Sequence, residues 1–348
     1  MNAEQLITAA AQAGASDIHI VHGMTPRIRR AGRLVPMGDS ILTDEDCDSL
    51  AAQLAGDSLN VLQETGELDT ALTVGGSRVR VNLFRQQGHT SAALRILADR
   101  IPDLDRLGLP PKVTELAELN HGIVLVTGET GSGKSTTLAA MIDRINHSRE
   151  EHILTLEDPI EYIYTPDRCI INQREVGRDT LSFSSGLRAA LREDPDIILV
   201  GEMRDLDTIE TALTAAETGH LVLGTLHTGT AADSIDRLVD VFPEGRQRQI
   251  RMQLSMTLQA VLSQQLLPTK DGTGRVAACE LMVVNAAIRN LIREGKTPQI
   301  ASALSTSAAE GGVTMDNAII RLYKAGKISA ATAKAAARDQ EYVKKNTL

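Results

Sequence analysis

Residues 128–135 read Gly128-Glu129-Thr130-Gly131-Ser132-Gly133-Lys134-Ser135, which matches G-x-x-x-x-G-K-[ST] at every fixed position. Glycines allow backbone N–H groups to converge on phosphate oxygens. A lysine in this place reaches the β- and γ-phosphates, and the hydroxyl after it is a ligand for Mg²⁺. The stretch therefore predicts a loop that binds ATP with Mg²⁺, built from residues Gly128 to Thr136.

The sequence around this loop agrees with that reading and disfavours an ordinary glycine-rich turn. An aliphatic run precedes the loop, and a helical pattern begins near Lys134, whose N-terminal dipole attracts phosphate. Further short aliphatic runs then alternate with helical stretches; the runs are Ile123–Thr127, Ile153–Leu156, Ile197–Val200 and Leu221–Leu226. Such alternation predicts an α/β domain whose sheet is mostly parallel and has helices on its faces.

The rest of the chain divides around this core. We predict a small α+β domain over 1–98, a proline-containing linker over 99–112, the ATPase core over 113–285 and a helical C-terminal region over 286–348. In the first domain, Thr43 caps a helix that reaches about Leu62, and Gly75-Gly76 joins two strands. The uncharged stretch Met252–Thr269 is studded with glutamines, which predicts a packed helix and not a membrane span. A hairpin follows near 270–274, and two short helical patterns follow Val313.

Composition narrows the function classes. The net charge is −9, so the basic footprint of a general nucleic-acid binder is missing and no nucleic acid is expected as a partner. The cysteines at 47, 169 and 279 form no C-x-x-C pair, so we expect no zinc module and a reducing cytoplasm. The first residues lack a basic start, and we expect no signal peptide.

Acidic residues follow two of the aliphatic runs, at the end of the sheet where ligands bind. Glu202 comes after the run Ile197–Val200 and suits a base that positions or deprotonates the attacking water. Gly201 stands where Walker-B sequences usually have aspartate, so Mg²⁺ needs support from elsewhere. Glu157 and Asp158 follow the run that ends at Leu156, and we predict that they support the ion indirectly. Solvated loop acids are the alternative.

Two histidines bracket the run Leu221–Leu226. His227 lies at its carboxyl end, where it could sense the γ-phosphate. His220 lies at the opposite end, so contact with the same phosphate is harder to reconcile with the topology. Both are candidate catalytic residues, and a structural role is the alternative for each.

Four blocks together resemble the secretion ATPase superfamily of type IV pili and type II secretion. They are the phosphate loop, the acidic box at 155–162, the Walker-B block at 194–205 and the histidine box at 219–228. The resemblance covers nearly the whole chain. It implies that glycine before the catalytic glutamate is this family's own arrangement. It also implies an N-terminal PAS-like domain, a RecA-like ATPase domain and a homo-hexamer.

Within that superfamily the chain is most similar to the pilus-retraction ATPases. It has neither the long N-terminal region nor the four-cysteine zinc module of many assembly and secretion ATPases, and Ala287–Glu294 resembles the C-terminal motif of the retraction enzymes. The resemblance implies a motor that couples ATP hydrolysis to retraction of the pilus and to twitching motility by domain motion. It also implies a cytoplasmic protein held at the inner face of the membrane by the pilus machine's platform protein.

The resemblance adds two arginines to the candidate site. Strand alternation places Arg80 on a polar face, opposite the face that carries Val79 and Val81. The superfamily's N-terminal arginines, spaced as Arg80 and Arg95 are, offset charge that develops on the γ-phosphate. Without the resemblance, both would be interpreted as solvated strand arginines.

The helical segment Ala287–Glu294 carries a second arginine pair. Ile288, Leu291 and Ile292 form one apolar stripe, and Arg289 and Arg293 lie four residues apart outside it. This predicts an exposed basic edge that either transmits force to a partner or is only solvated.

Other functions stay open from the sequence alone. A small-molecule kinase or GTPase shares the loop, although N-K-x-D is absent from the sequence. A related ATPase that moves secreted protein or DNA, an accessory retraction paralogue and a nucleotide-gated module that hardly turns over are the remaining alternatives.

Overall fold

The structure is a computed structural model that describes residues 2–30, 33–75, 77–97 and 100–347. The chain divides into two compact units. The first contains residues up to Ile101 together with Pro159–Ile163, and the second contains Pro102–Asp158 and Tyr164 onward. The predicted boundary at 98/99 and Gly76 of the predicted hairpin lie outside the described residues. Arg100 and Ile101 of the predicted linker belong to the first unit, whereas residues 102–112 and residues 286–347 belong to the second.

The first unit is built on a six-stranded antiparallel sheet in the order β3-β2-β1-β6-β5-β4. Its strands are β1 Asp17–Ile20, β2 Arg27–Arg30, β3 Arg33–Pro36, β4 Glu67–Val74, β5 Ser77–Gln86 and β6 His89–Ile96, and its helices are α1 Ala3–Gln12, α2 Asp44–Ala55 and α3 Leu59–Thr65. On β5, Val79, Val81 and Leu83 are fully buried in a core shared with α1 and α2, as the alternation predicts.

Thr43 caps α2 through a capping box with Asp46, as predicted. The predicted single helix to Leu62 is wrong, because α2 ends at Gly56, where φ is +52°. That conformation interrupts the helical path and is easiest for glycine. A separate helix, α3, then continues to Thr65.

The second unit is built on a seven-stranded sheet in the order β13-β12-β7-β11-β10-β8-β9. Only β12 and β13 pair antiparallel, so the prediction of a mostly parallel sheet is confirmed. Its strands are β7 Gly122–Thr127, β8 His152–Glu157, β9 Ile170–Glu175, β10 Ile197–Val200, β11 Leu221–Leu226, β12 Leu258–Pro268 and β13 Arg275–Val283. Strands β7, β10 and β11 are buried along their whole length, which explains their continuous aliphatic runs.

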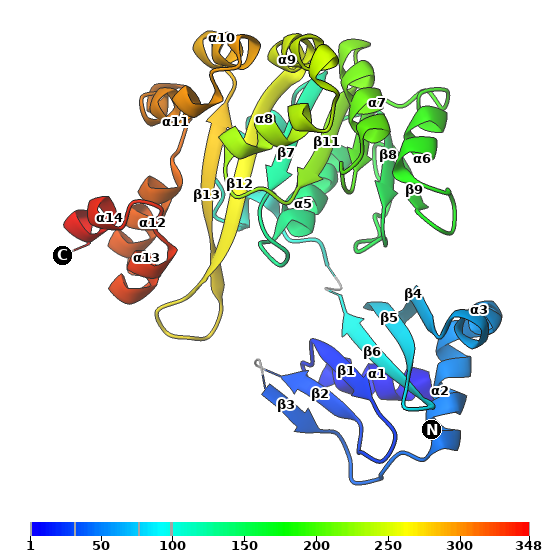
Figure 1. The fold of residues 1–348 in the computed structure, drawn as a ribbon. Coiled ribbons are helices and arrows are strands. Elements are labelled where there is room, and N and C mark those ends of the chain that lie inside the picture. Colours follow the sequence, from blue (N-terminus) through cyan, green and yellow to red (C-terminus); the bar gives the residue numbers. More distant parts are fainter. Residues whose placement is uncertain (1, 31–32, 76, 98–99, 348) are drawn as a thin grey trace. The chain divides into compact units, whose positions relative to one another are not determined.

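Helices cover this sheet, and their packing positions the loops at its carboxyl edge (Figure 1). The helices are α4 Lys112–Leu116, α5 Lys134–Ser148, α6 Phe183–Ala190, α7 Leu206–Glu217, α8 Ala231–Asp240 and α9 Glu244–Thr257. One aliphatic core joins alternate residues of β7, β8, β10 and β11 to α6 through α9. Helix α5 packs against β7.

The uncharged stretch Met252–Thr269 is not the packed helix that the sequence predicts. Helix α9 ends at Thr257, and residues 258–268 form β12, which pairs with both β7 and β13. A strand buried between two neighbours needs no polar alternation, so its sequence cannot be told from a buried helix. The hairpin predicted at 270–274 joins β12 to β13 and is present.

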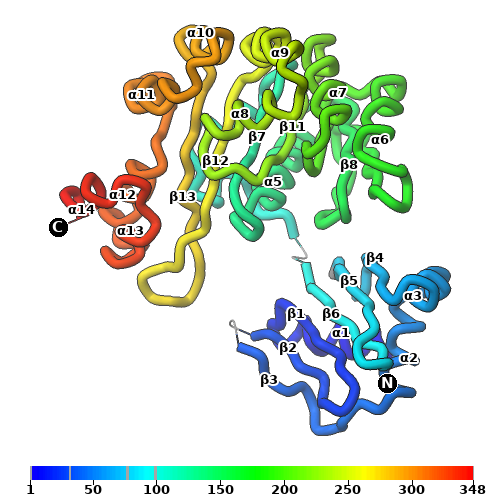
Figure 2. Tube along the Cα trace, viewed as in Figure 1, coloured from blue at the N-terminus to red at the C-terminus, as the bar shows by residue number. Residues whose placement is uncertain are grey.

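The C-terminal part is helical, as predicted, but it has more helices than the sequence indicated. They are α10 Ala286–Glu294, α11 Ile300–Ser305, α12 Met315–Lys324, α13 Ala330–Ala336 and α14 Gln340–Asn346. The last three form a small core with Leu267 and Ala278 at the ends of β12 and β13. Figure 2 shows this part following the β12–β13 hairpin.

Candidate functional site

The phosphate-loop residues lie between β7 and α5, as predicted. Gly128, Gly131 and Gly133 have φ angles of 141°, 79° and 95°, which side chains disfavour. A Cβ atom on Gly128 would lie 2.3 Å from the Gln264 carbonyl oxygen and 2.6 Å from Ser132 Oγ. Glycine is therefore required at 128, because the loop backbone passes directly against β12.

The Lys134 side chain crosses the loop and is nearly buried. Its Nζ donates to the carbonyl oxygens of Gly128 at 2.7 Å and Glu129 at 3.0 Å. Lys134 is also the first residue of α5, so its charge adds to the positive end of the helix dipole. Ser135 follows with an exposed side chain. This arrangement suits the phosphates of a nucleotide.

The strand order sets how far each motif lies from the loop. Strands β11, β10 and β8 follow β7 in that order. His227, Glu202 and Glu157 come from the carboxyl ends of these three strands. At about 4.8 Å per strand, their backbones lie roughly 5, 10 and 14 Å across the sheet from β7. His227 and Glu202 are thus placed to reach a γ-phosphate and its attacking water, whereas Glu157 would act through an intermediary.

Gly201 is explained by the neighbouring strand. Its N–H donates to the Leu156 carbonyl oxygen at 2.8 Å. A Cβ atom at 201 would lie 3.0 Å from that oxygen and 3.3 Å from Glu157 Cα. An aspartate here would press against the backbone of β8, so the first acidic side chain after β10 is Glu202.

Glu202 and His227 lie together at the mouth of a pocket of about 370 Å³. His227 Nε2 is 3.1 Å from Glu202 Oε1, and Arg204 pairs with the same oxygen. Burial lowers the pKa of His227, and the positive charge of Lys134 lowers it further, while Glu202 opposes the shift. His227 is therefore mainly neutral at pH 7. Because β11 pairs with β7 and Leu226 lies opposite Thr127, His227 follows its strand beside the phosphate loop.

Glu157 is fixed in place, whereas Asp158 is exposed. Glu157 Oε1 accepts hydrogen bonds from Thr155 Oγ1 at 2.7 Å and Gln173 Nε2 at 3.2 Å. These bonds hold the carboxylate at the carboxyl edge of the sheet. Its place three strands from β7 agrees with an indirect role toward Mg²⁺.

His220 lies at the amino end of β11, about 23 Å along the strand from His227 at roughly 3.3 Å per residue. Its Nδ1 is 2.9 Å from the Ala215 carbonyl oxygen and 3.2 Å from Thr218 Oγ1. Within one chain the structure does not bring His220 to the phosphate loop. Its catalytic role stays a prediction.

The sequence analysis missed the contribution of β12 and the C-terminal helices to the site. Gln264 Nε2 donates to Thr137 Oγ1 of α5 at 3.0 Å, and Arg338 bonds the Gly229 carbonyl oxygen and the Glu280 carboxylate. A pocket of about 450 Å³ is lined by Gln264, Arg338 and Gly229 together with loop residues 128–132. Recognising β12 as the first strand of the predicted hairpin would have indicated part of this wall.

The sequence profile of the family described as "Type II/IV secretion system protein" matches residues 2–330. The chain belongs to this family. It is 47% identical over 343 residues to the type IV pilus retractation ATPase PilT of Pseudomonas aeruginosa, covering 98% of this chain and 99% of that one. It is 38% identical to the type IV pilus ATPase PilU of the same organism, over 94% and 87% of the two chains.

Solved structures extend the comparison. The crystal structure of the pilus retraction motor PilT with bound ADP superposes with a TM-score of 0.92 at 48% identity, covering 99% of both chains. Like other members of this secretion ATPase family, the chain is an ATP-hydrolysing enzyme. No helix in the described part of the chain is long and apolar enough to cross a membrane.

The two arginines that the resemblance adds to the candidate site are neighbours in the first unit. Arg80 on β5 and Arg95 on β6 are direct cross-strand partners, and both are exposed. Arg95 Nε donates to Asp17 Oδ1 at 2.9 Å, and Arg29 Nε is 3.7 Å from Asp17 Oδ2. Like charges opposite each other on a sheet repel, so this face favours an additional anion.

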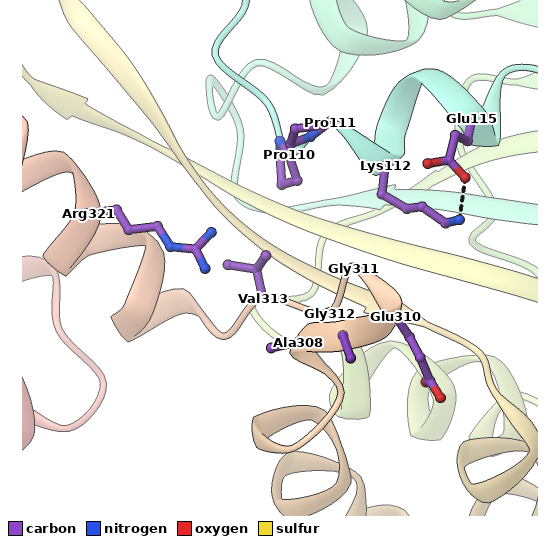
Figure 3. Close-up of a pocket in the computed structure, with 11 residues that line it drawn as sticks. Pro110, Pro111, Lys112, Glu115, Ala308, Glu310, Gly311, Gly312, Val313 and Arg321 are labelled. Carbon is purple, nitrogen blue, oxygen red and sulfur yellow. Dashed lines mark hydrogen bonds and ion pairs between the residues drawn. The ribbon is translucent and has the colours of Figure 1, made fainter.

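A third pocket in the same unit is lined by none of the phosphate-loop residues. Figure 3 shows this pocket, of about 380 Å³, between Pro110–Lys112 and Gly311–Val313. The Lys112 ammonium pairs with Glu115, which neutralises one of the positive charges that line the pocket. It is therefore not the nucleotide site.

Arg289 is not part of the exposed edge that the sequence predicts. It is half-buried, and its guanidinium donates to the carbonyl oxygens of Ser255 at 2.7 Å and Met256 at 3.0 Å and to Gln259 Oε1 at 3.0 Å. The Ser255 and Met256 carbonyls belong to the last turn of α9, where carbonyl oxygens have no N–H partner within the helix. Arg293 is exposed and bonds Asn290 at 3.3 Å.

We therefore expect Arg289→Ala and Arg293→Ala to differ in their effect on the stability of the fold. Arg289→Ala leaves two carbonyls at the end of α9 without this donor, and it should lower the free energy of unfolding by about 1–3 kcal/mol. Arg293→Ala, its matched control, should stay within about 0.5 kcal/mol of wild type. Thermal unfolding of both purified variants measures this. Equal stability of the two would show that the Arg289 contacts are not stabilising.

Proposed function

We propose that this chain is the motor ATPase that drives retraction of a type IV pilus. The observation that carries the proposal is 47% identity to PilT over nearly the full length of both chains. The site supports it, because Lys134, Glu202 and His227 gather at one edge of the sheet. Two compact units in one chain provide the parts whose relative motion would deliver the force.

The residues at this carboxyl edge of the sheet have the following proposed roles toward the nucleotide. ATP would bind through residues 128–136, the Ser135 hydroxyl would hold Mg²⁺, and Glu157 and Asp158 would support the ion indirectly. Glu202 accepts the proton of the attacking water, and His227 detects the γ-phosphate. We place the adenine ring of the nucleotide in a pocket of about 290 Å³, which is lined by Leu107–Leu109, Gly133, Thr136 and Arg275. This pocket adjoins the phosphate loop on the α5 side.

The motor is proposed to be a homo-hexamer that lies in the cytoplasm against the membrane, held by the platform protein of the pilus machine. In such a ring, Arg80 and Arg95 serve the γ-phosphate by stabilising the charge of the transition state. The cross-strand pairing of two exposed cations supports this proposal, since an anion relieves their repulsion. His220 acts, if at all, toward a neighbouring subunit, because its own phosphate loop is at the other end of β11.

Deletion of the gene in the source cell tests the proposed function. We expect surface pili to remain while retraction and twitching motility are lost, because assembly does not need the retraction motor. Retraction measured by live imaging of labelled pili gives the readout, and complementation with the wild-type gene should restore it. Loss of surface pili would instead indicate an assembly ATPase.

An accessory retraction ATPase is the second candidate, and the 38% identity to PilU supports keeping it. In that case the deleted cell would still retract its pili, with reduced force.

Complementation of the deleted cell with Arg293→Ala tests whether the exposed end of α10 contacts the pilus machine. Retraction should fall while purified ATP turnover stays at the wild-type rate, since Arg293 lies outside the nucleotide site.

A further inference from the structure

Three side chains with no part in the nucleotide chemistry meet in the first unit. His22 follows β1, Asp44 is the first residue of α2 and His89 is the first residue of β6. One nitrogen or oxygen atom from each lies within 4.8 Å of the other two. The three positions are too far apart in sequence to form a spacing motif.

Both imidazoles approach the same carboxylate oxygen. Asp44 Oδ1 is 2.6 Å from His89 Nδ1 and 3.0 Å from His22 Nδ1, and the rings stack with centroids 4.2 Å apart and planes 8° from parallel. His22 Nδ1 is buried and makes no hydrogen bond, because its contact with Asp44 lacks hydrogen-bond geometry. A buried ring nitrogen without such a partner is unfavourable, and a bound cation would supply one.

Hydrogen bonds hold the three positions in place. Gly23 N–H donates to the Leu42 carbonyl oxygen at 2.9 Å, which ties the turn that carries His22 to the segment before α2. Thr90 Oγ1 donates to Asp48 Oδ1 at 2.6 Å, which ties the start of β6 to α2. These bonds fix the backbone positions that carry the three side chains, so only side-chain rotations are needed when an ion binds.

We propose that His22, Asp44 and His89 bind one divalent transition-metal ion of the zinc class, with water completing its shell. Two imidazole nitrogens and a carboxylate oxygen suit such ions, at about 2.0–2.2 Å from zinc. Mg²⁺ and Ca²⁺ prefer oxygen ligands alone. The side chains are 37%, 53% and 37% exposed, so water and the ion have access. Because the two rings are stacked and a ligated ion lies in the plane of each imidazole, binding requires the Asp44 side chain to rotate and one imidazole to turn out of the stack, which opens the set to the roughly 3.3 Å ligand spacing of a tetrahedral ion.

Cys47 lies one turn beyond Asp44 on α2 but does not belong to this set. Burial raises the pKa of its thiol to about 11, and the carboxylates of Asp44, Asp46 and Asp48 contribute to the shift. A thiol must lose its proton before it ligates a metal. The expectation of no zinc module came from unpaired cysteines, and it does not address a histidine–aspartate set.

The ion would join the end of β1, the start of α2 and the start of β6. Calorimetric titration of the tag-free, metal-stripped full chain with ZnCl₂, without nucleotide, tests this. Wild type should bind one equivalent, and zinc should raise its melting temperature. His22→Gln, Asp44→Asn and His89→Gln should each weaken binding by roughly 10-fold or more and remove the thermal shift.

His121→Gln is the matched control, because His121 is exposed and lies outside the set; it should bind zinc as wild type does. ATP turnover with Mg²⁺, measured without zinc, should be unchanged in all four variants and confirms that they fold. No zinc binding by wild type would overturn the proposal. So would binding that survives in all three ligand variants, which would leave the cluster as an ordinary hydrogen-bonded contact.

Discussion

Lys134→Ala should abolish ATP turnover. The ammonium is fixed across the loop by the Gly128 and Glu129 carbonyl oxygens, so its charge meets the β- and γ-phosphates without reorganisation. Removing a fixed charge of this kind lowers the rate by roughly 10²–10³-fold or more. Phosphate release by the purified variant measures the effect, and nucleotide affinity should fall with it.

Lys112→Ala is the matched control for that experiment. Lys112 pairs with Glu115 in a pocket without loop residues, and its removal should leave turnover near wild type. A second readout is the pKa of His227 by NMR. Because the Lys134 charge holds that pKa down, after burial, it should rise in Lys134→Ala. Wild-type turnover in Lys134→Ala would refute the assigned phosphate loop.

The local sequence pattern was sufficient to predict which edge of the second unit's sheet carries the candidate nucleotide site. The runs that became β7, β8, β10 and β11 are aliphatic along their length because parallel strands are buried on both faces. Chain order and the rule for ligands at strand ends then placed Glu202 and His227 correctly at the carboxyl edge. The same rule placed His220 at the far end, as the structure shows.

Features that depend on a neighbouring element could not be predicted. Glycine is favoured at 201 because a Cβ atom there would lie 3.0 Å from the Leu156 carbonyl oxygen of β8. Arg289 bonds the carbonyl oxygens at the end of α9. Both features depend on tertiary packing. Residues 258–268 were assigned to a helix because a fully buried strand lacks alternation. The His22, Asp44 and His89 cluster draws on three segments that only the fold brings together.

Glu202→Gln should retain ATP binding and reduce turnover by roughly 10²-fold or more, the scale of removing a general base. The amide keeps the shape of the side chain, which is 18% exposed and 3.1 Å from His227, but it cannot accept a proton from water. Nucleotide binding and single-turnover hydrolysis separate the two effects. Glu157→Gln is the comparison variant, one strand further along the sheet, and it should reduce turnover less because Glu157 is proposed to support the ion only indirectly. If it is the more damaging change, Glu157 is the base.

Glu202→Gln, mixed with Arg80→Ala, also tests whether Arg80 acts between subunits. Arg80→Ala should lower turnover more than ATP affinity, since the charge that it offsets develops in the transition state. Rings that mix Arg80→Ala and Glu202→Gln subunits contain some sites with both an intact arginine and an intact glutamate if Arg80 serves a neighbour. Such rings should therefore hydrolyse ATP faster than either variant alone. Mixed rings, confirmed by native mass spectrometry, that stay as slow as the two parents would restrict Arg80 to its own subunit.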